Sequence, residues 1–222
     1  MNVKDVSALG SVHTLDLSNC VNITDVNSLK SVHTLDLSYC KNITDVSQLK
    51  LVQKLTLTDC NNIININMLT SLNYLEIQGC KKITNISNLN KLNYLNMYGC
   101  VNIKDISMLH NLKILIMKGC EKIKSIGNLK IKNISMSHNL KVLHYHGNRN
   151  KLEVGNLRNL EKIYIDRNIH GIHLLKKLKV LSMCKFTFIN QRIIIKKNIK
   201  KLKEVNKNVK IIDYHDLECV NC

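Results

Sequence analysis

Cysteine is the residue type whose spacing first suggests chemistry in this 222-residue sequence. Six of the nine cysteines recur at one constant interval, at Cys20, Cys40, Cys60, Cys80, Cys100 and Cys120. A zinc site of the usual kind needs ligand pairs about two to four residues apart, and these six are not paired in that way. A free cysteine otherwise packs as a small hydrophobic residue. We therefore interpret the six as a structural ladder of reduced thiols and expect no metal among them.

The C-terminal tail holds a second set of potential ligands, His215, Cys219 and Cys222. They supply three donors without an evident fourth, unless Cys184 joins them. The last four residues also match the bare form of a prenylation box, but Asn221 stands where an aliphatic residue is usual. Metal binding and prenylation stay open as alternatives, and we favour a frayed terminus with no cofactor.

Catalytic side chains do not form a convincing group. His13, Asp16 and Ser18 occur together, but the same set returns one repeat later because the whole segment returns. A catalytic triad needs one special geometry with an oxyanion hole. The sequence has no glycine-rich phosphate loop and no His-Glu-x-x-His motif. We predict that the protein is not an enzyme.

The elements that carry these residues follow from the repeat itself. The frame is Leu-x-x-Leu-x-Leu-x-x-Cys-x-x-Ile-x-x-Ile/Val-x-x-Leu, and it is clean at Leu72, Leu75, Ile77, Cys80, Ile83, Ile86 and Leu89. Leu15 and Leu17 alternate with polar residues, which indicates a short strand that pairs in parallel with its neighbours. Apolar residues then follow at a spacing of three, which suits a 3₁₀ turn. We expect Asp25, Asp45 and Asp105 to cap the free amides of these turns.

This frame resembles the leucine-rich repeat. The cysteine-containing stretch is similar to repeats of F-box-type proteins, and the short Ile-Thr-Asp return resembles internalin-like repeats. The whole pattern looks most like short 20-residue repeat proteins of giant DNA viruses of amoebae. The resemblance implies an α/β solenoid: a parallel β-sheet on the concave face, short 3₁₀ or turn segments on the convex face, and a C-terminal helical cap.

The repeat register divides the chain in two. We expect a leucine-rich-repeat solenoid over residues 1–188 and a C-terminal cap and tail over 189–222. The coil at about 121–148 is irregular, because Ile106–Cys120 aligns with Ile134–Asn148 rather than with the segment one regular period later. The alternative is an extra strand at Ile134–Met136. Residues 189–205 predict an amphipathic helix with Asn190 as N-cap, followed by a strand at 209–212. The candidate inner positions of this helix are Ile193, Ile194, Leu202 and Val205.

The outward strand residues of the middle coils form the candidate binding site. Aromatic and aliphatic residues there fall on neighbouring rungs, which is the composition of an interface core. We predict partner contacts on the concave face at Tyr74, Glu76, Tyr94, Asn96, Tyr98, Ile114 and Ile116. The expected function is non-catalytic protein–protein interaction. The alternatives are a substrate-recognition adaptor for a ubiquitin ligase and a basic nucleic-acid-binding protein. The lack of an F-box-like segment before the repeats counts against the adaptor.

Charge and termini complete the expectations. The formal net charge is +17, and residues 121–222 hold 22 of the 33 Lys and Arg residues. Arginine is scarce and aromatic residues do not alternate with the lysines, so we do not favour nucleic acid as the partner. The first residues align with the interior of a repeat, which predicts self-association through an uncapped N-terminal coil. Without a signal peptide or a membrane span, we expect an intracellular protein, in the host cytoplasm if viral, that is not secreted.

Overall fold

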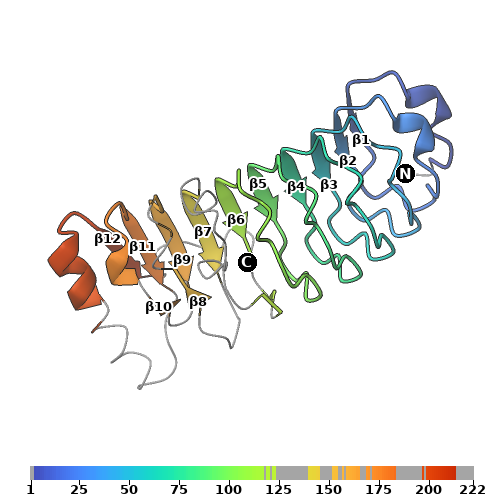
Figure 1. Ribbon diagram of the computed structural model, residues 1–222. Coiled ribbons are helices and arrows are strands. Elements are labelled where there is room, and N and C mark those ends of the chain that lie inside the picture. The colour runs from blue at the N-terminus through green and yellow to red at the C-terminus, as the bar shows by residue number, and fades with distance from the viewer. Residues whose placement is uncertain are drawn as a thin grey trace.

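Short parallel strands lie side by side along an elongated molecule (Figure 1). The computed structural model describes residues 3–117, 119–120, 122–123, 140–145, 152–154, 157, 159–165, 169–170, 172–183, 197 and 199–213. Most of the strands form one ten-stranded sheet in the order β1-β2-β3-β4-β5-β6-β7-β9-β11-β12. The pairings between neighbours are parallel throughout. The expected parallel-sheet solenoid is confirmed.

The elements are short, as a coil with such a short sequence repeat requires. The strands of the main sheet are β1 (Thr14–Asp16), β2 (Thr34–Asp36), β3 (Lys54–Thr56), β4 (Tyr74–Glu76), β5 (Tyr94–Asn96), β6 (Ile114–Ile116), β7 (Val142–Tyr145), β9 (Lys162–Ile165), β11 (Val180–Met183) and β12 (Lys210–Asp213). A separate two-stranded parallel sheet joins β8 (Leu152–Glu153) to β10 (Ile169–His170). The 3₁₀ segments are η1 (Ser7–Leu9), η2 (Asn27–Leu29) and η3 (Ile172–Leu174).

The register of the sheet follows the sequence repeat. Each residue of the first five strands pairs with the equivalent residue of the next coil, as in Thr14 with Thr34 and Tyr74 with Tyr94. Ile114 then pairs with Val142, so the coil that follows β6 is longer than the regular ones. This confirms the expected alignment of Ile106–Cys120 with Ile134–Asn148. Because β6 lies directly beside β7, no strand stands between them in the sheet, and Ile134–Met136 lies outside the described residues.

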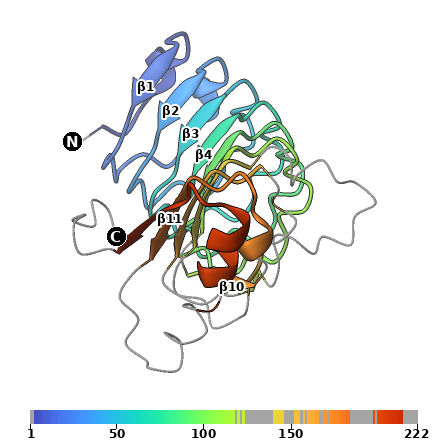
Figure 2. The same ribbon diagram turned by 90° about the vertical axis from the view of Figure 1, so that its left-hand side faces the viewer.

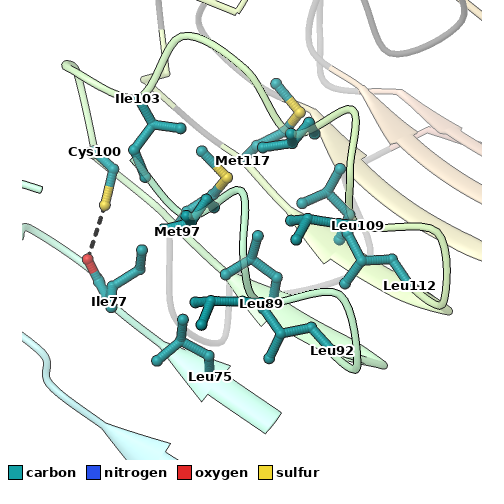
Figure 3. Close-up of a cluster of buried hydrophobic side chains, with 14 of the residues drawn as sticks. Leu75, Ile77, Leu89, Leu92, Met97, Cys100, Ile103, Leu109, Leu112 and Met117 are labelled. Atoms are coloured by element: carbon teal, nitrogen blue, oxygen red, sulfur yellow. Dashed lines mark hydrogen bonds between the residues drawn. The ribbon is translucent and has the colours of Figure 1, made fainter. Parts of the chain in front are cut away.

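The core is the inner side of every coil. Leu35 and Leu37 point inward from one coil and are almost fully buried, while Asp36 between them faces out. The inward positions repeat from coil to coil, as Figure 3 shows for Met97 and Met117. A single coil cannot bury its own apolar set, so stability comes from stacking coil on coil. In the first coil, Leu15 is only partly buried.

The turn after each of the first five periodic cysteines is closed by a carboxylate or an amide. The Oδ1 atoms of Asp25, Asp45 and Asp105 each accept a hydrogen bond of 2.8 Å from the backbone N–H two residues later. This confirms the predicted caps. Asn65 and Asn85 accept the equivalent bonds at 2.9 Å, a role that we did not predict for them.

The residue before each of the six periodic cysteines has a left-handed backbone. Gly79, Gly99 and Gly119 have φ values of 74°, 72° and 70°. In the first three coils the same position holds Asn19, Tyr39 and Asp59, with φ values of 62°, 64° and 57°. A side chain at such φ is costly, most of all for a bulky residue such as Tyr39. The coil therefore keeps the same turn conformation at this position even where the residue itself disfavours a positive φ.

The C-terminal end departs from the repeat. Residues 199–205 are helical (Figure 2). Leu202 in this segment is fully buried. Val205 is 51% exposed, so its prediction as an inner residue is wrong. Leu202 packs in the core, whereas Val205, about one turn later at the end of the helical segment, extends beyond it. Asn190, Ile193 and Ile194 fall outside the described residues.

Candidate binding surface

The outward residues of the strands form two rows across the sheet. The first residues of β4, β5 and β6 pair as Tyr74, Tyr94 and Ile114. The third residues of these strands pair as Glu76, Asn96 and Ile116. The parallel register thus brings six of the seven predicted contact residues together, and Tyr98 follows two residues after Asn96. We call these seven residues the central patch.

The two tyrosines of the first row stack on each other. The rings of Tyr74 and Tyr94 lie 4.2 Å apart between centroids and are inclined by 5°. Lys54 Nζ lies 4.7 Å from the centroid of the Tyr74 ring. Burial is the main cause that raises the pKa of both phenol groups. The two hydroxyls therefore stay protonated at neutral pH, and the row presents neutral aromatic rings.

Glu76 links the two rows. The Tyr74 hydroxyl donates a hydrogen bond to Glu76 Oε1, and Gln78 Nε2 donates one of 3.2 Å to Oε2. These contacts fix the carboxylate in place on β4, where Glu76 is half-buried. The Glu76 carboxylate also adds to the raised pKa of the Tyr74 hydroxyl, because a nearby carboxylate disfavours a phenolate.

The predicted residues differ in what they offer a partner. Tyr98 is 39% exposed, whereas Asn96 is 8% exposed. Asn96 Oδ1 accepts a hydrogen bond of 3.3 Å from the Tyr98 backbone N–H. Asn96 thus shapes the strand end and gives little surface of its own. The exposure of the remaining members of the patch is intermediate, because each is flanked by the neighbouring rungs.

The surface continues beyond the predicted residues. Val142 and His144 of β7 lie next to Ile114 and Ile116. His144 stacks on Tyr164 of β9, with ring centroids 4.2 Å apart. The predicted patch ends at Ile116 because the longer coil interrupts the 20-residue repeat in the sequence. The alignment of Ile106–Cys120 with Ile134–Asn148 is the sequence feature that predicts the continuation of the surface onto β7.

The recurring His, Asp and Ser residues have structural contacts. The rings of His13 and His33 stack, with centroids 4.3 Å apart. The Oδ1 atoms of Asp16 and Asp36 accept bonds of 2.8 Å from the backbone N–H groups two residues later. The carboxylates therefore close turns at the strand ends, and these contacts do not orient a histidine as a base.

The six periodic cysteines are buried and form no disulfide bonds. From the second coil to the sixth, each thiol donates a hydrogen bond to the carbonyl 23 residues earlier, as Cys100 Sγ does to Ile77 O at 2.8 Å (Figure 3). Burial is the main cause that raises the pKa of Cys40 to about 11 and of Cys60, Cys80 and Cys120 to about 12. Neutral thiols with a carbonyl partner are poor metal ligands and poor nucleophiles.

Metal ligands and membrane spans are the remaining features that bear on function. The described part of the chain contains no group of three or more His, Cys, Asp or Glu side chains that could hold a metal ion. His215, Cys219, Cys222 and Cys184 lie outside the described residues. Among the helices that the structure describes, none has the length and hydropathy needed to span a membrane.

Comparisons with known proteins bear on the fold. No protein-family model matches the sequence, and no curated protein matches it. An internalin (inlF) from Listeria monocytogenes is similar over 94% of this chain, with a TM-score of 0.58 and 22% identity. The functional domain of InlJ from the same bacterium, which includes a cysteine ladder, is similar over 82% of this chain, with a TM-score of 0.52 and 22% identity.

These likenesses establish the fold: the chain is a solenoid of the leucine-rich-repeat type. It spans 65% of the length of the internalin and 46% of the InlJ chain. Both neighbours are bacterial, so the resemblance to giant-virus proteins stays a prediction.

Proposed function

We propose that this protein is a non-catalytic interaction module that binds a partner protein on the outward face of its sheet, at the central patch. The observation that carries the proposal is the row of Tyr74, Tyr94 and Ile114 on adjacent strands. Tyrosine is favoured at the centres of interfaces because it offers a large contact area at a small cost in side-chain entropy. Contiguous apolar area of this kind is uncommon on the surface of a monomer.

The fixed geometry of the patch supports the same proposal. Ring stacking and the contacts of Glu76 hold the side chains in one arrangement before a partner arrives. A preformed surface loses little conformational entropy on binding, and this lowers the cost of association. The structural contacts of His13, Asp16 and Ser18 are consistent with a binding role rather than a catalytic one.

We also propose the domain division of 1–188 for the solenoid and 189–222 for the cap and tail. Leu202 of the helical segment is fully buried. Asn206 Nδ2 donates to Lys176 O at 3.2 Å and to Leu178 O at 2.6 Å, which ties the end of the helix to the coil before β11. Such a segment would cover the last coil, as solenoids require at their ends.

Affinity capture with variant proteins tests the binding surface. We expect Tyr94→Ala with Tyr98→Ala to reduce recovery of partner proteins by about tenfold or more, because loss of a central aromatic contact costs about 2 kcal/mol. Tyr98→Ala alone removes the more exposed ring and spares the Tyr74 stack, so it serves as a milder variant. Partner abundance would be measured by quantitative mass spectrometry, with thermal melting as a check on folding.

The matched control is Met68→Ala with Met108→Ala. These side chains are 52% and 48% exposed and lie in the turn segments rather than in the strands. The control variant should capture the same partners as the unmodified protein. Equal recovery by the tyrosine variants and the unmodified protein would exclude the central patch as the binding surface.

A further inference from the structure

Charged residues on the sheet face are ordered along the solenoid. In the first coils the acidic residues are Asp16, Asp36 and Glu76, at the third position of β1, β2 and β4. The one lysine on strands β1–β4 is Lys54 of β3, and it lies over the Tyr74 ring. The N-terminal part of the face is therefore acidic.

The later coils have the opposite sign. Lys162 and Lys210 begin β9 and β12, and Lys141 and Lys179 directly precede β7 and β11. Glu161 directly precedes β9, and its carboxylate lies 3.9 Å from Lys141 Nζ and 2.7 Å from Lys179 Nζ. Both of these lysines keep more than half of their side-chain surface exposed, at 60% and 69%. Over the described residues of these four strands and the positions directly before them, the four lysines outnumber the two acidic residues, Glu161 and Asp213, so this part of the face is basic.

The apolar surface lies between the two charged ends. Ile114, Ile116 and Val142 occupy adjacent strands, with Tyr94 on one side and Tyr164 on the other. Seven strand steps separate β2 from β11 in the sheet. At roughly 4.8 Å per step this is about 34 Å, which an extended polypeptide spans with about ten residues.

We propose that the partner contributes a linear polypeptide segment with a basic end, an apolar or aromatic centre and an acidic end. The basic end lies over β1–β4, the centre lies over β5–β7, and the acidic end lies over β9–β12. Charge complementarity supports this occupant, since opposite potentials favour encounter and fix the direction in which a segment lies. The inference rests on the proposed function, because it uses the same face and names the chemistry of the partner.

A random peptide library tests the inference without a known partner. Phage-displayed peptides of about 12 residues, long enough to reach from β2 to β11 when extended, would be selected on the full-length protein at low ionic strength. We expect enriched peptides with Lys or Arg at one end, aromatic or aliphatic residues in the centre, and Asp or Glu at the other end.

Variants then separate the two proposals. The triple variant Asp16→Asn, Asp36→Asn, Glu76→Gln removes the acidic end and keeps an acceptor oxygen for the turn contacts of residues 16 and 36 and for the Tyr74 hydroxyl. It should weaken the binding of an enriched synthetic peptide by about tenfold at low salt, as measured by fluorescence anisotropy. Glu204→Gln, which removes one charge on the C-terminal helical segment, is the control and should leave the affinity unchanged.

Each result decides between the proposals. Peptides that lose affinity with both Tyr94→Ala and the triple variant support both. Peptides that depend on Tyr94 but carry no opposite charges at their ends overturn the charge order and leave the proposed function standing. If no peptide is enriched, the linear-segment inference is overturned and the proposed function stands. If the enriched peptides bind equally well to the Tyr94→Ala variant, the linear-segment inference is overturned and the result also counts against the central patch.

Discussion

The thiol of each ladder cysteine from the second coil onward has a specific hydrogen-bond partner in the preceding coil. Leu17 O, for example, accepts both the Cys20 backbone N–H at 3.1 Å and Cys40 Sγ at 3.1 Å. A buried carbonyl without partners is costly, and a thiol is small enough to reach it from the next coil. Cysteine therefore does more at this position than fill space, since it connects adjacent coils through a weak donor.

Thiol labelling checks the state of the ladder. The pKa of Cys60, Cys80 and Cys120 is raised from an ordinary 9.0 to about 12, so the folded state holds these protons more tightly than the unfolded state. This contribution to stability is complete below pH 9 and is lost as the pH rises from 9 towards 12. At about pH 10, where an ordinary thiol is mostly ionised, we expect iodoacetamide to leave these three residues unmodified by peptide mass spectrometry.

The same labelling in denaturant is the control, and all three residues should then react. Rapid modification in the folded state, with the circular dichroism spectrum unchanged, would show that the thiols are not shielded by the coils.

At the scale of the single element, the turn after the cysteine uses Asp and Asn interchangeably. Asp105 Oδ1 accepts the Ser107 backbone N–H at 2.8 Å, and Asn85 Oδ1 accepts that of Ser87 at 2.9 Å. What matters is an acceptor oxygen on a short side chain, and both residue types supply one. The repeated Ile-Thr-Asp motif predicts aspartate as the capping residue, whereas either Asp or Asn can accept this hydrogen bond.

Substitution at Asp105 separates charge from hydrogen bonding. We expect Asp105→Ala to lower the free energy of unfolding by about 1 kcal/mol, because the Ser107 amide loses its acceptor. Asp105→Asn should cost much less, since Asn65 and Asn85 already fill this role. Urea unfolding followed by circular dichroism would measure both. Equal losses for the two variants would mean that the negative charge, rather than the hydrogen bond, stabilises the turn.

Element prediction from the sequence succeeds where the repeat is regular and weakens where it is not. The alternation around Leu35 and Leu37 locates β2, and the constant period then locates its neighbours. The pair β8 and β10 was not predicted, because two residues are too few to show a period. Val205 was misplaced for a related reason: helical spacing marks an apolar face but does not show how far the last coil extends beneath it.

The whole molecule behaves as a stack of similar units. Contacts between strands join each strand to its immediate neighbours in the sheet. Such an architecture gains stability from nearest-neighbour interfaces, so its length is not fixed by closure of the fold. The central patch depends on the stack as a whole. Its two rows join residues that are one whole coil apart in sequence and that become neighbours only through the strand register.

Deletion of one complete coil tests the modular stack. Removing residues 61–80 joins Cys60 to Lys81 and preserves the repeat frame. We expect a folded protein with a cooperative thermal transition a few degrees lower, because one of the interfaces between adjacent coils is lost. Removing residues 61–70 alone breaks the frame and should prevent folding beyond that point. A folded half-coil deletion, or an unfolded full-coil deletion, would contradict independent stacking.

The long coil between β6 and β7 has a practical consequence. Ile114 and Val142 are direct partners although the chain between them is longer than in the regular repeats. Strand pairing thus tolerates extra sequence between β6 and β7. An epitope tag inserted into this coil should therefore leave the strand order unchanged and allow the protein to be located with an antibody.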